Sequence, residues 1–224
     1  MEGRYPAGIL LILADLKGQD EARLLEWLYA SHLPAALAAG PISAALFYRN
    51  AGRTAELPAR DTPIKYLFVY EVARRPLRRG LSEAEDFFRS NLGSKGAPAL
   101  LPRHVVPYQK EGPAFTTELT GRPVRGLDAV FTNCSDPARE EEFDRWYNLL
   151  HANEVLDSRM FHTAYRFHNV RRDQQPSRHL ALYETDLNVV DALDRHLNSP
   201  SRAQRFYVNT LARVMRGAFV SLRP

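Results

Sequence analysis

One stretch decides the fold: Asp136-Pro137-Ala138-Arg139-Glu140-Glu141-Glu142-Phe143-Asp144-Arg145-Trp146-Tyr147-Asn148-Leu149-Leu150-His151. The chain uses it twice, because a weaker copy runs from Gln19-Asp20 to His32. Each copy has the apolar spacing of an amphipathic helix. Each also carries one tryptophan followed five positions later by one histidine, Trp27 and His32 in the first and Trp146 and His151 in the second. The chain contains only these two tryptophans, so chance explains the match poorly and the pattern predicts a duplication.

The similarity extends beyond the helix into two apolar segments. Residues 65–71 align with residues 178–184, with Tyr-Glu at the end of both, and residues 46–50 align with residues 165–169. A repeat of this length, about 110 residues, predicts two similar domains rather than a solenoid, whose repeats are shorter.

The first half has the pattern of a β-α-β-β-α-β unit, the ferredoxin-like order. Short apolar runs rich in β-formers predict strands, and Ser82 with Glu85 has the spacing of a capping box. Pro34 is expected to end the first helix just after His32. The expected elements are strands at 8–15, 42–49, 64–72 and 103–109, helices at 20–32 and 82–92, and a polar connection at 50–63.

The second half repeats this order. Asp136 suits an N-cap, Pro137 the first turn, and Glu140 to Glu142 place negative charge near the positive end of the helix dipole. The expected elements are strands at 127–134, 161–169, 179–185 and 215–222, and one or two helices over 188–213, interrupted near Ser199-Pro200. We therefore predict an α+β fold of two tandem ferredoxin-like domains, 1–112 and 126–224, joined by a Gly- and Pro-rich linker at 113–125.

Composition excludes several functions. The formal charge is +4 and the Lys and Arg residues are scattered, unlike the concentrated basic face of a nucleic-acid-binding protein. Cys134 is the only cysteine, which excludes an internal disulfide and a cysteine metal cage. No stretch approaches the roughly 18 to 20 apolar residues that span a bilayer. We expect a cytoplasmic protein that contacts neither nucleic acid nor membrane.

These residues resemble a known family. The run from Asp136 through Phe143, Trp146 and His151, followed by Phe161, Ala164 and Arg166, is similar to the EthD-like branch of the dimeric α+β barrel superfamily. That resemblance implies two ferredoxin-like sheets packed face to face, here within one chain, with a homodimer of such chains also possible. It also implies pockets between sheet and helices, lined by aromatic residues and a histidine. Relatives in the superfamily include cofactor-free cyclases, isomerases and decarboxylases, monooxygenases and haem-binding enzymes, and fold alone does not choose among them.

His151 and His32 are the leading catalytic candidates. Each is expected at the C-terminal end of its helix, where the negative pole tends to raise the pKa of an imidazole. Such a group could transfer protons near neutral pH. A structural role, capping the last carbonyls or bridging the repeats, is the alternative.

The candidate substrate-binding residues surround these histidines. Trp27 and Trp146 have the spacing of core anchors and could still form a pocket wall beside Tyr147. Strand alternation places Tyr66 and His179 on one face and Glu71 and Glu184 on the other, without saying which faces a pocket. Tyr165 and Arg166 must likewise face opposite sides. Arg166 could hold a carboxylate or phenolate or form an outward salt bridge, and His168 lies near it in sequence.

The sequence lacks the motifs of other mechanisms. It has no histidine-rich metal motif, no Gly-rich phosphate loop, no Gly-x-Ser-x-Gly elbow and no Rossmann fingerprint. We therefore expect no metal and no cofactor. The favoured hypothesis is a cofactor-independent lyase, isomerase or cyclase that uses histidine acid/base catalysis on a small hydrophobic, aromatic or polyketide-like substrate. The alternatives are a haem-dependent or cofactor-free monooxygenase of the same fold, and a non-catalytic small-molecule-binding accessory protein.

Overall fold

A computed structural model describes residues 1–18, 20–52, 64–94, 96–171, 173–203 and 205–223. Most of the predicted polar connection 50–63 lies outside these ranges. The first half contains β1 (Gly8–Leu16), α1 (Glu21–Trp27), η1 (Leu28–His32), α2 (Leu33–Ala38), β2 (Ile42–Asn50), β3 (Tyr66–Val72), α3 (Leu77–Asn91) and β4 (Leu100–Lys110).

The second half begins with a short strand inside the predicted linker, β5 (Phe115–Thr116), which pairs with β7. It continues with β6 (Gly126–Cys134), η2 (Pro137–Arg139), α4 (Glu140–Trp146), η3 (Tyr147–His151), α5 (Ala152–Leu156), β7 (Thr163–Asn169), β8 (His179–Thr185), α6 (Val189–Leu197), α7 (Pro200–Ala203) and β9 (Leu211–Ser221).

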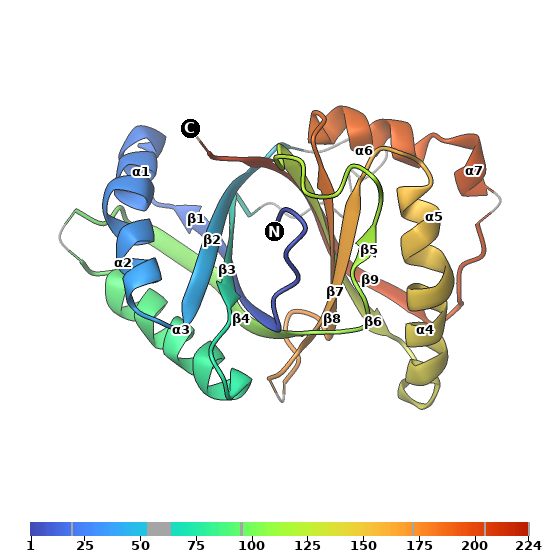
Figure 1. Cartoon of the computed structure of the whole chain (residues 1–224), viewed down its shortest axis with the longest axis horizontal. Coiled ribbons are helices and arrows are strands. Elements are labelled where there is room, and N and C mark those ends of the chain that lie inside the picture. The colour runs from blue at the N-terminus through green and yellow to red at the C-terminus, as the bar shows by residue number, and fades with distance from the viewer. Residues whose placement is uncertain (19, 53–63, 95, 172, 204, 224) are drawn as a thin grey trace.

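The strands form one antiparallel sheet that closes on itself. Their order is β4-β1-β3-β2-β9-β6-β8-β7-β5, and β4 also pairs with β7. The two seams, β2 with β9 and β4 with β7, join the strands of one half to those of the other. Figure 1 shows the two curved sheets facing each other, with the helices of each half on the outside. The predicted α+β architecture is confirmed.

Alternation along the strands divides the core into three layers. Leu67, Val69, Leu180 and Leu182 lie in the layer between the two sheets, within the barrel. The other face of each strand packs against its own helices, as Phe68 does in the first half and Ala181 in the second. By the same period of two, Glu71 and Glu184 face the barrel interior, whereas Tyr66 and His179 face the helices. Tyr66 and His179 therefore lie on the helix-covered face of their sheets, a choice that the sequence alone did not decide.

The first helix of each half differs from the prediction in one informative way. The prediction that Pro34 ends the helix after His32 is wrong: the chain passes through the π-helical turn η1 and continues as α2, with Pro34 in its first turn. A proline is tolerated at that position. The second half has the same arrangement, α4, η3 and α5. His32 and His151 thus end a π turn within a longer helix, and such turns occur often at functional sites.

Other helix boundaries also differ. The helix α3 begins at Leu77, after Pro76, so Ser82 lies inside it and is not its N-cap. The segment predicted as helix up to residue 213 is helical only to Ala203, and β9 begins at Leu211. The N-cap prediction for Asp136 is confirmed, because its carboxylate accepts from the Ala138 N–H at 3.0 Å. Among the described residues, no helix has the length and apolarity needed to cross a membrane.

Candidate functional site

In the first half, His32 lies in a closed aromatic cluster between the helices and the sheet. Its ring lies 4.3 Å from the Trp27 ring, centroid to centroid, and also approaches Phe87. Its Nε2 forms a 2.7 Å hydrogen bond with the Tyr70 hydroxyl. Only 1% of His32 is exposed, and burial lowers its pKa to about 4. The ring is held by packing and by one hydroxyl, as expected of a core residue.

In the second half, His151 has the same position but different neighbours. Its ring stacks on Trp146 at 4.6 Å and 18°, and Tyr147 meets it edge-on at 4.9 Å. Neither ring nitrogen has a hydrogen-bond partner among the described residues: the nearest carboxylate oxygen to Nδ1, on Glu154, is 3.9 Å away. Tyr183, which aligns with Tyr70, bonds instead to the Tyr147 hydroxyl at 3.1 Å. His151 is therefore free to bond to something else.

His151 borders a small enclosed space, which we call the His151 cavity. Its volume is about 30 Å³, room for one or two water molecules. Valines and a leucine provide part of the wall, and the polar part consists of tyrosines, histidines and arginines. The lining side chains include Tyr147, His151, Val155, Tyr183, His196, Leu197, Arg202, Tyr207, Arg213 and Arg216.

The surroundings of the cavity are positively charged. Burial, together with the charges of Arg205, Arg216 and Arg213, lowers the pKa of His151 to about 3. The prediction that a helix terminus raises this pKa is wrong for both histidines, because the helix continues beyond them and burial dominates. His151 is neutral near pH 7, and one of its ring nitrogens is available to accept a proton.

His196 and two arginines form the back of this site. The His196 Nδ1 lies 3.1 Å from the Ser158 hydroxyl, and its Nε2 faces the Arg205 guanidinium at 3.2 Å. Because arginine can only donate, Nε2 is the acceptor and the proton is on Nδ1. Arg216 is buried and makes a two-point ion pair with Asp128, at 2.8 and 2.6 Å. These contacts hold two of the lining side chains, His196 and Arg216, in place.

A second polar cluster adjoins the cavity through Tyr147. The Arg166 guanidinium lies 4.3 Å from the centre of the Tyr147 ring. It donates to Asn148 and Asp144, at 2.8 Å each, and lies 3.2 Å from Glu111. Arg166 is only 1% exposed, so the interpretation of an outward salt bridge is wrong: the partners are carboxylates within the helix–sheet layer.

His179 belongs to this second cluster. Its Nδ1 lies 2.9 Å from Glu111 and its Nε2 lies 3.0 Å from Glu140. Burial alone would raise the pKa of Glu111, but the bond to His179 and the charge of Arg166 lower it to about 2. His168 is half-buried opposite His179 on the paired strand. The cluster is an internally neutralised ion network.

Among the described residues, one group has the donors and spacing for a metal ion: Glu111, Asp144 and His179. The Arg166 guanidinium already occupies the space between the two carboxylates. A cation there would face that fixed positive charge, so the cluster suits an ion network better than a metal site.

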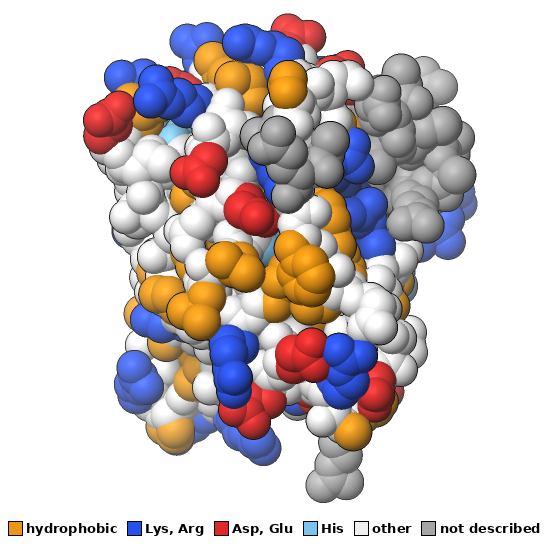
Figure 2. Space-filling model, turned by 90° about the vertical axis from the view of Figure 1, so that its right-hand side faces the viewer, with side chains coloured by type: hydrophobic (Ala, Val, Ile, Leu, Met, Phe, Trp, Pro, Cys, Tyr) orange, Lys and Arg blue, Asp and Glu red, His pale blue; other side chains and the backbone are white. Residues whose placement is uncertain are grey.

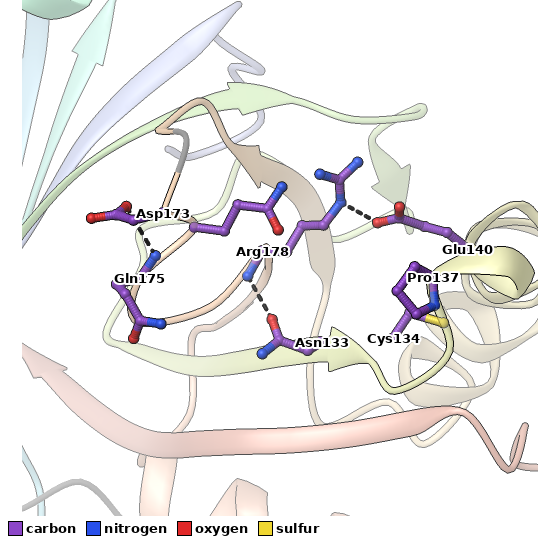
Figure 3. Close-up of a pocket in the computed structure, with 8 residues that line it drawn as sticks. Asn133, Cys134, Pro137, Glu140, Asp173, Gln175 and Arg178 are labelled. Atoms are coloured by element: carbon purple, nitrogen blue, oxygen red, sulfur yellow. Dashed lines mark hydrogen bonds and ion pairs between the residues drawn. The ribbon is translucent and has the colours of Figure 1, made fainter.

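A surface groove lies beyond this cluster, at the end of β6 and the loop between β7 and β8 (Figure 3). Its volume is about 430 Å³. In the close-up, Arg178 and Glu140 form an ion pair on one side, and the Arg178 N–H donates to Asn133 at 2.7 Å. Cys134 lies at one end with its thiol directed to the Asp136 carbonyl. The polar groups are engaged with one another.

The other predicted residues are distributed over several places. Trp146 and Tyr147 lie at the His151 cavity, whereas Trp27 packs in the closed first-half cluster with Tyr66 on the same helix side of the sheet. Tyr165 faces the barrel interior and donates to Glu184 at 3.1 Å. Arg166, His168 and His179 gather in the ion network. The structure therefore brings together most second-half candidates and separates them from Tyr165 and the first-half ones.

Sequence reasoning missed the acidic and arginine partners. Glu111 comes from the end of the first half, next to the predicted linker. Arg213 and Arg216 lie on β9, but the predicted strand, 215–222, included only Arg216, and residue 213 fell in the segment predicted as helix. Arg216 reaches Asp128 through the pairing of β6 with β9. A buried-strand pattern interrupted by Asp128 and Arg216 was the available signal.

No family model matches the chain, and no curated protein does. Solved structures do match. A variant of chlorite dismutase from Candidatus Nitrospira defluvii has a TM-score of 0.55 and 11% identity, over 96% of this chain and 92% of that one. A candidate monooxygenase from Lactobacillus acidophilus NCFM has a TM-score of 0.53 and 10% identity, over 97% and 94%. An encapsulated DyP-type peroxidase from Mycobacterium smegmatis has a TM-score of 0.58 and 10% identity, over 96% and 92%. The chain shares its dimeric α+β barrel fold with these proteins.

Proposed function

We propose that the protein is an oxidoreductase of the monooxygenase kind whose reaction centre is the His151 cavity. The similar folds bear the names of a dismutase, a monooxygenase and a peroxidase, all of them redox enzymes. At about 10% identity these structures share the fold with this chain, and the proposal rests on the residues of the site. This proposal favours an oxidative reaction over the lyase, isomerase or cyclase reaction that the sequence alone suggested.

The observation that carries the proposal is the state of His151. Its ring is neutral at physiological pH, largely buried, without a hydrogen-bond partner among the described residues, and close to several arginines. A pKa of about 3 makes this imidazole a weak base, but a substrate anion beside it raises that pKa, and the ring can then take a proton from a phenolic or enolic hydroxyl. The arginine charges then stabilise the anion that forms, and that electron-rich anion is the species that reacts with dioxygen. The anion also raises the pKa of the imidazolium beside it, which favours the transfer.

Haem is the cofactor that the wider superfamily suggests, and the site must be tested for it. The donor set suits haem, since an imidazole could bind its iron and the arginines could pair with its two carboxylates. The space is not: the cavity measures about 30 Å³, whereas large ligands need pockets of several hundred Å³. Arg213, Arg216 and Tyr207 line this cavity, and the larger groove that adjoins it is open to the surface and does not include His151. The side chains as arranged do not fit haem.

The experiment is an oxygen-uptake assay on protein treated with a chelator. A panel of hydroxylated aromatic acids, phenols and 1,3-diketones should contain a substrate that consumes one dioxygen per molecule. His151→Ala should lower the rate, and His104→Ala, a histidine on β4 of the first half, should not. Turnover of the same panel under nitrogen would instead support a lyase, isomerase or cyclase. Binding without turnover would support a non-catalytic accessory protein.

We also propose that the two halves, 1–112 and 126–224, are copies of one ferredoxin-like unit related to the EthD-like branch, with 113–125 as the linker. The helix–π turn–helix arrangement at equivalent places supports this origin, as does the matching strand order on either side of the seams. A homodimer of such chains and a cytoplasmic location remain predictions.

A further inference from the structure

Most of the polar side chains in the wall of the His151 cavity can donate hydrogen bonds. Arg202, Arg213 and Arg216 contribute guanidinium groups. Tyr147 and Tyr183 bond to each other, and since one hydroxyl donates, the proton of the other is left to donate elsewhere. Burial raises the pKa of both tyrosines, so both hydroxyls keep their protons.

Among the described residues, no carboxylate lines the cavity and few lie near it. Asp128 is buried and already paired, through both oxygens, with Arg216. Arg205 is also buried, and its Nη2 has no partner among the described residues. The nearest carboxylate to His151, Glu154, lies 3.9 Å from it. The three lining arginines with one paired carboxylate, Asp128, leave net positive charge at the cavity, and an anion there would be attracted by it.

The cavity connects to a larger open space. A groove of about 530 Å³ shares Leu197, Arg202 and Tyr207 with it and continues over Asn198 and Pro200. Figure 2 shows apolar side chains gathered in the middle of this outer face, between charged groups. Phe206 and Leu150 are 65% and 49% exposed. An entering molecule would meet an apolar surface first and the arginines at its inner end.

We propose that the His151 cavity binds the carboxylate of an aromatic acid, whose ring lies in the open groove against Tyr207. A carboxylate has three heavy atoms, matches the volume of the cavity, and pairs with guanidinium groups at two points. A hydroxyl ortho to it would come close to the imidazole. The assignment of this acid as a substrate rests on the proposed function, and its binding does not.

Calorimetric titration tests the binding separately from turnover. Benzoate, 2-hydroxybenzoate, benzamide and phenol are compared in a chloride-free buffer of fixed ionic strength, because chloride would compete. The two acids should bind at least 10-fold more tightly than benzamide and phenol. Arg213→Gln should weaken benzoate binding about 10- to 100-fold, the value of a hydrogen bond to a charged group. Arg145→Gln, an exposed arginine paired with Glu141 on α4, should not change it.

A second variant guards against loss of folding in Arg213→Gln. Val155→Leu adds one methylene to the wall and leaves every charge in place, so it should abolish benzoate binding without lowering the melting temperature. Benzamide binding as tightly as benzoate would overturn the proposal, and so would undiminished benzoate binding by Val155→Leu. Tight benzoate binding without any oxygen uptake would uphold this site and overturn the proposed oxygenase. Oxygen uptake with phenols but not with aromatic acids would overturn this carboxylate site and support the proposed oxygenase.

Discussion

The His32 and His151 regions begin from the same local structure and end in opposite chemical states. In both, a helix passes through a π turn that ends in histidine, and the histidine ring lies against a tryptophan. In the first half, the ring bonds to Tyr70. In the second half, the aligned Tyr183 is taken by Tyr147, and the imidazole keeps both nitrogens unused by the described residues. The Tyr147 hydroxyl, which Leu28 at the equivalent position of the first half lacks, bonds to Tyr183. The His151 imidazole is therefore left without the tyrosine partner that His32 has.

The neighbouring positions diverge in the same direction. Where the first half has Phe47 and Tyr66 on the helix side of its sheet, the second half has Arg166 and His179 in the aligned positions. The first layer is aromatic and is held by packing, and no charged group contributes to the pKa shift of His32. The second layer adds ion pairs to its apolar packing and borders a cavity. The two halves thus differ in what surrounds the equivalent histidine.

The largest expected effect separates the two histidines by activity. His151→Ala should lower kcat/KM for oxygen uptake by about 10²- to 10⁴-fold, the usual contribution of a general base. His32→Ala should leave the rate within about threefold, because its ring contacts only core residues and a hydroxyl. Steady-state oxygen-electrode kinetics on both variants measure this difference. Equal losses in the two variants would mean that the halves are functionally alike.

The next effect concerns the ion network that the first half lacks. Arg166→Met should lower the free energy of unfolding by about 3–5 kcal/mol, because it leaves the Glu111 carboxylate buried without its arginine. Urea denaturation followed by tryptophan fluorescence measures the loss. Arg49→Met is the matched control: Arg49 is an exposed arginine at the end of β2, paired with Glu21, and its loss should cost less than about 1 kcal/mol. Comparable costs at both positions would show that the network contributes little.

The sequence predicted the features that depend on local pattern. Apolar runs placed the strands of both halves, and the repeated spacing of Trp and His placed a helix at the equivalent point of each half. The sequence did not predict the features that depend on contacts between residues far apart in the chain. Pro34 was expected to stop a helix, but a proline can continue a helix that restarts after a π turn. Arg216 and Asp128 become partners only when β9 pairs with β6, and Glu111 reaches His179 from the far end of the first half. Such contacts leave no local periodicity.

Acid should weaken folding through histidines in both halves. Burial lowers the pKa of His32 to about 4, of His151 to about 3 and of His196 to about 2. The folded state keeps these rings neutral, whereas the unfolded chain protonates them below about 6.5. Unfolding therefore takes up protons as pH falls from 6.5 towards 4, and stability decreases through that window. Above pH 6.5 the effect vanishes.

Melting temperatures measured between pH 7.5 and 5 test this expectation. The window lies above the range in which Glu111, with its pKa lowered to about 2, contributes. His196→Asn and His32→Gln should each reduce the slope by about one proton. A melting temperature that stays constant between pH 6.5 and 5 would show that the rings are not held neutral.

The smallest expected difference is between the Tyr70 hydroxyl, which bonds to His32, and the Tyr183 hydroxyl, which bonds to Tyr147. Tyr70→Phe removes the partner of the His32 Nε2 and leaves a buried nitrogen unpaired, at a cost of about 1–3 kcal/mol in the free energy of unfolding. Tyr183→Phe removes a hydroxyl whose partner, Tyr147, lines a cavity where water can replace it, so its cost should be smaller, about 1 kcal/mol or less. Urea denaturation of the two variants compares them directly. A larger loss for Tyr183→Phe would mean that the tyrosine pair, rather than the first-half histidine, is the structural element, and that the second half is less free for chemistry than its unused imidazole suggests.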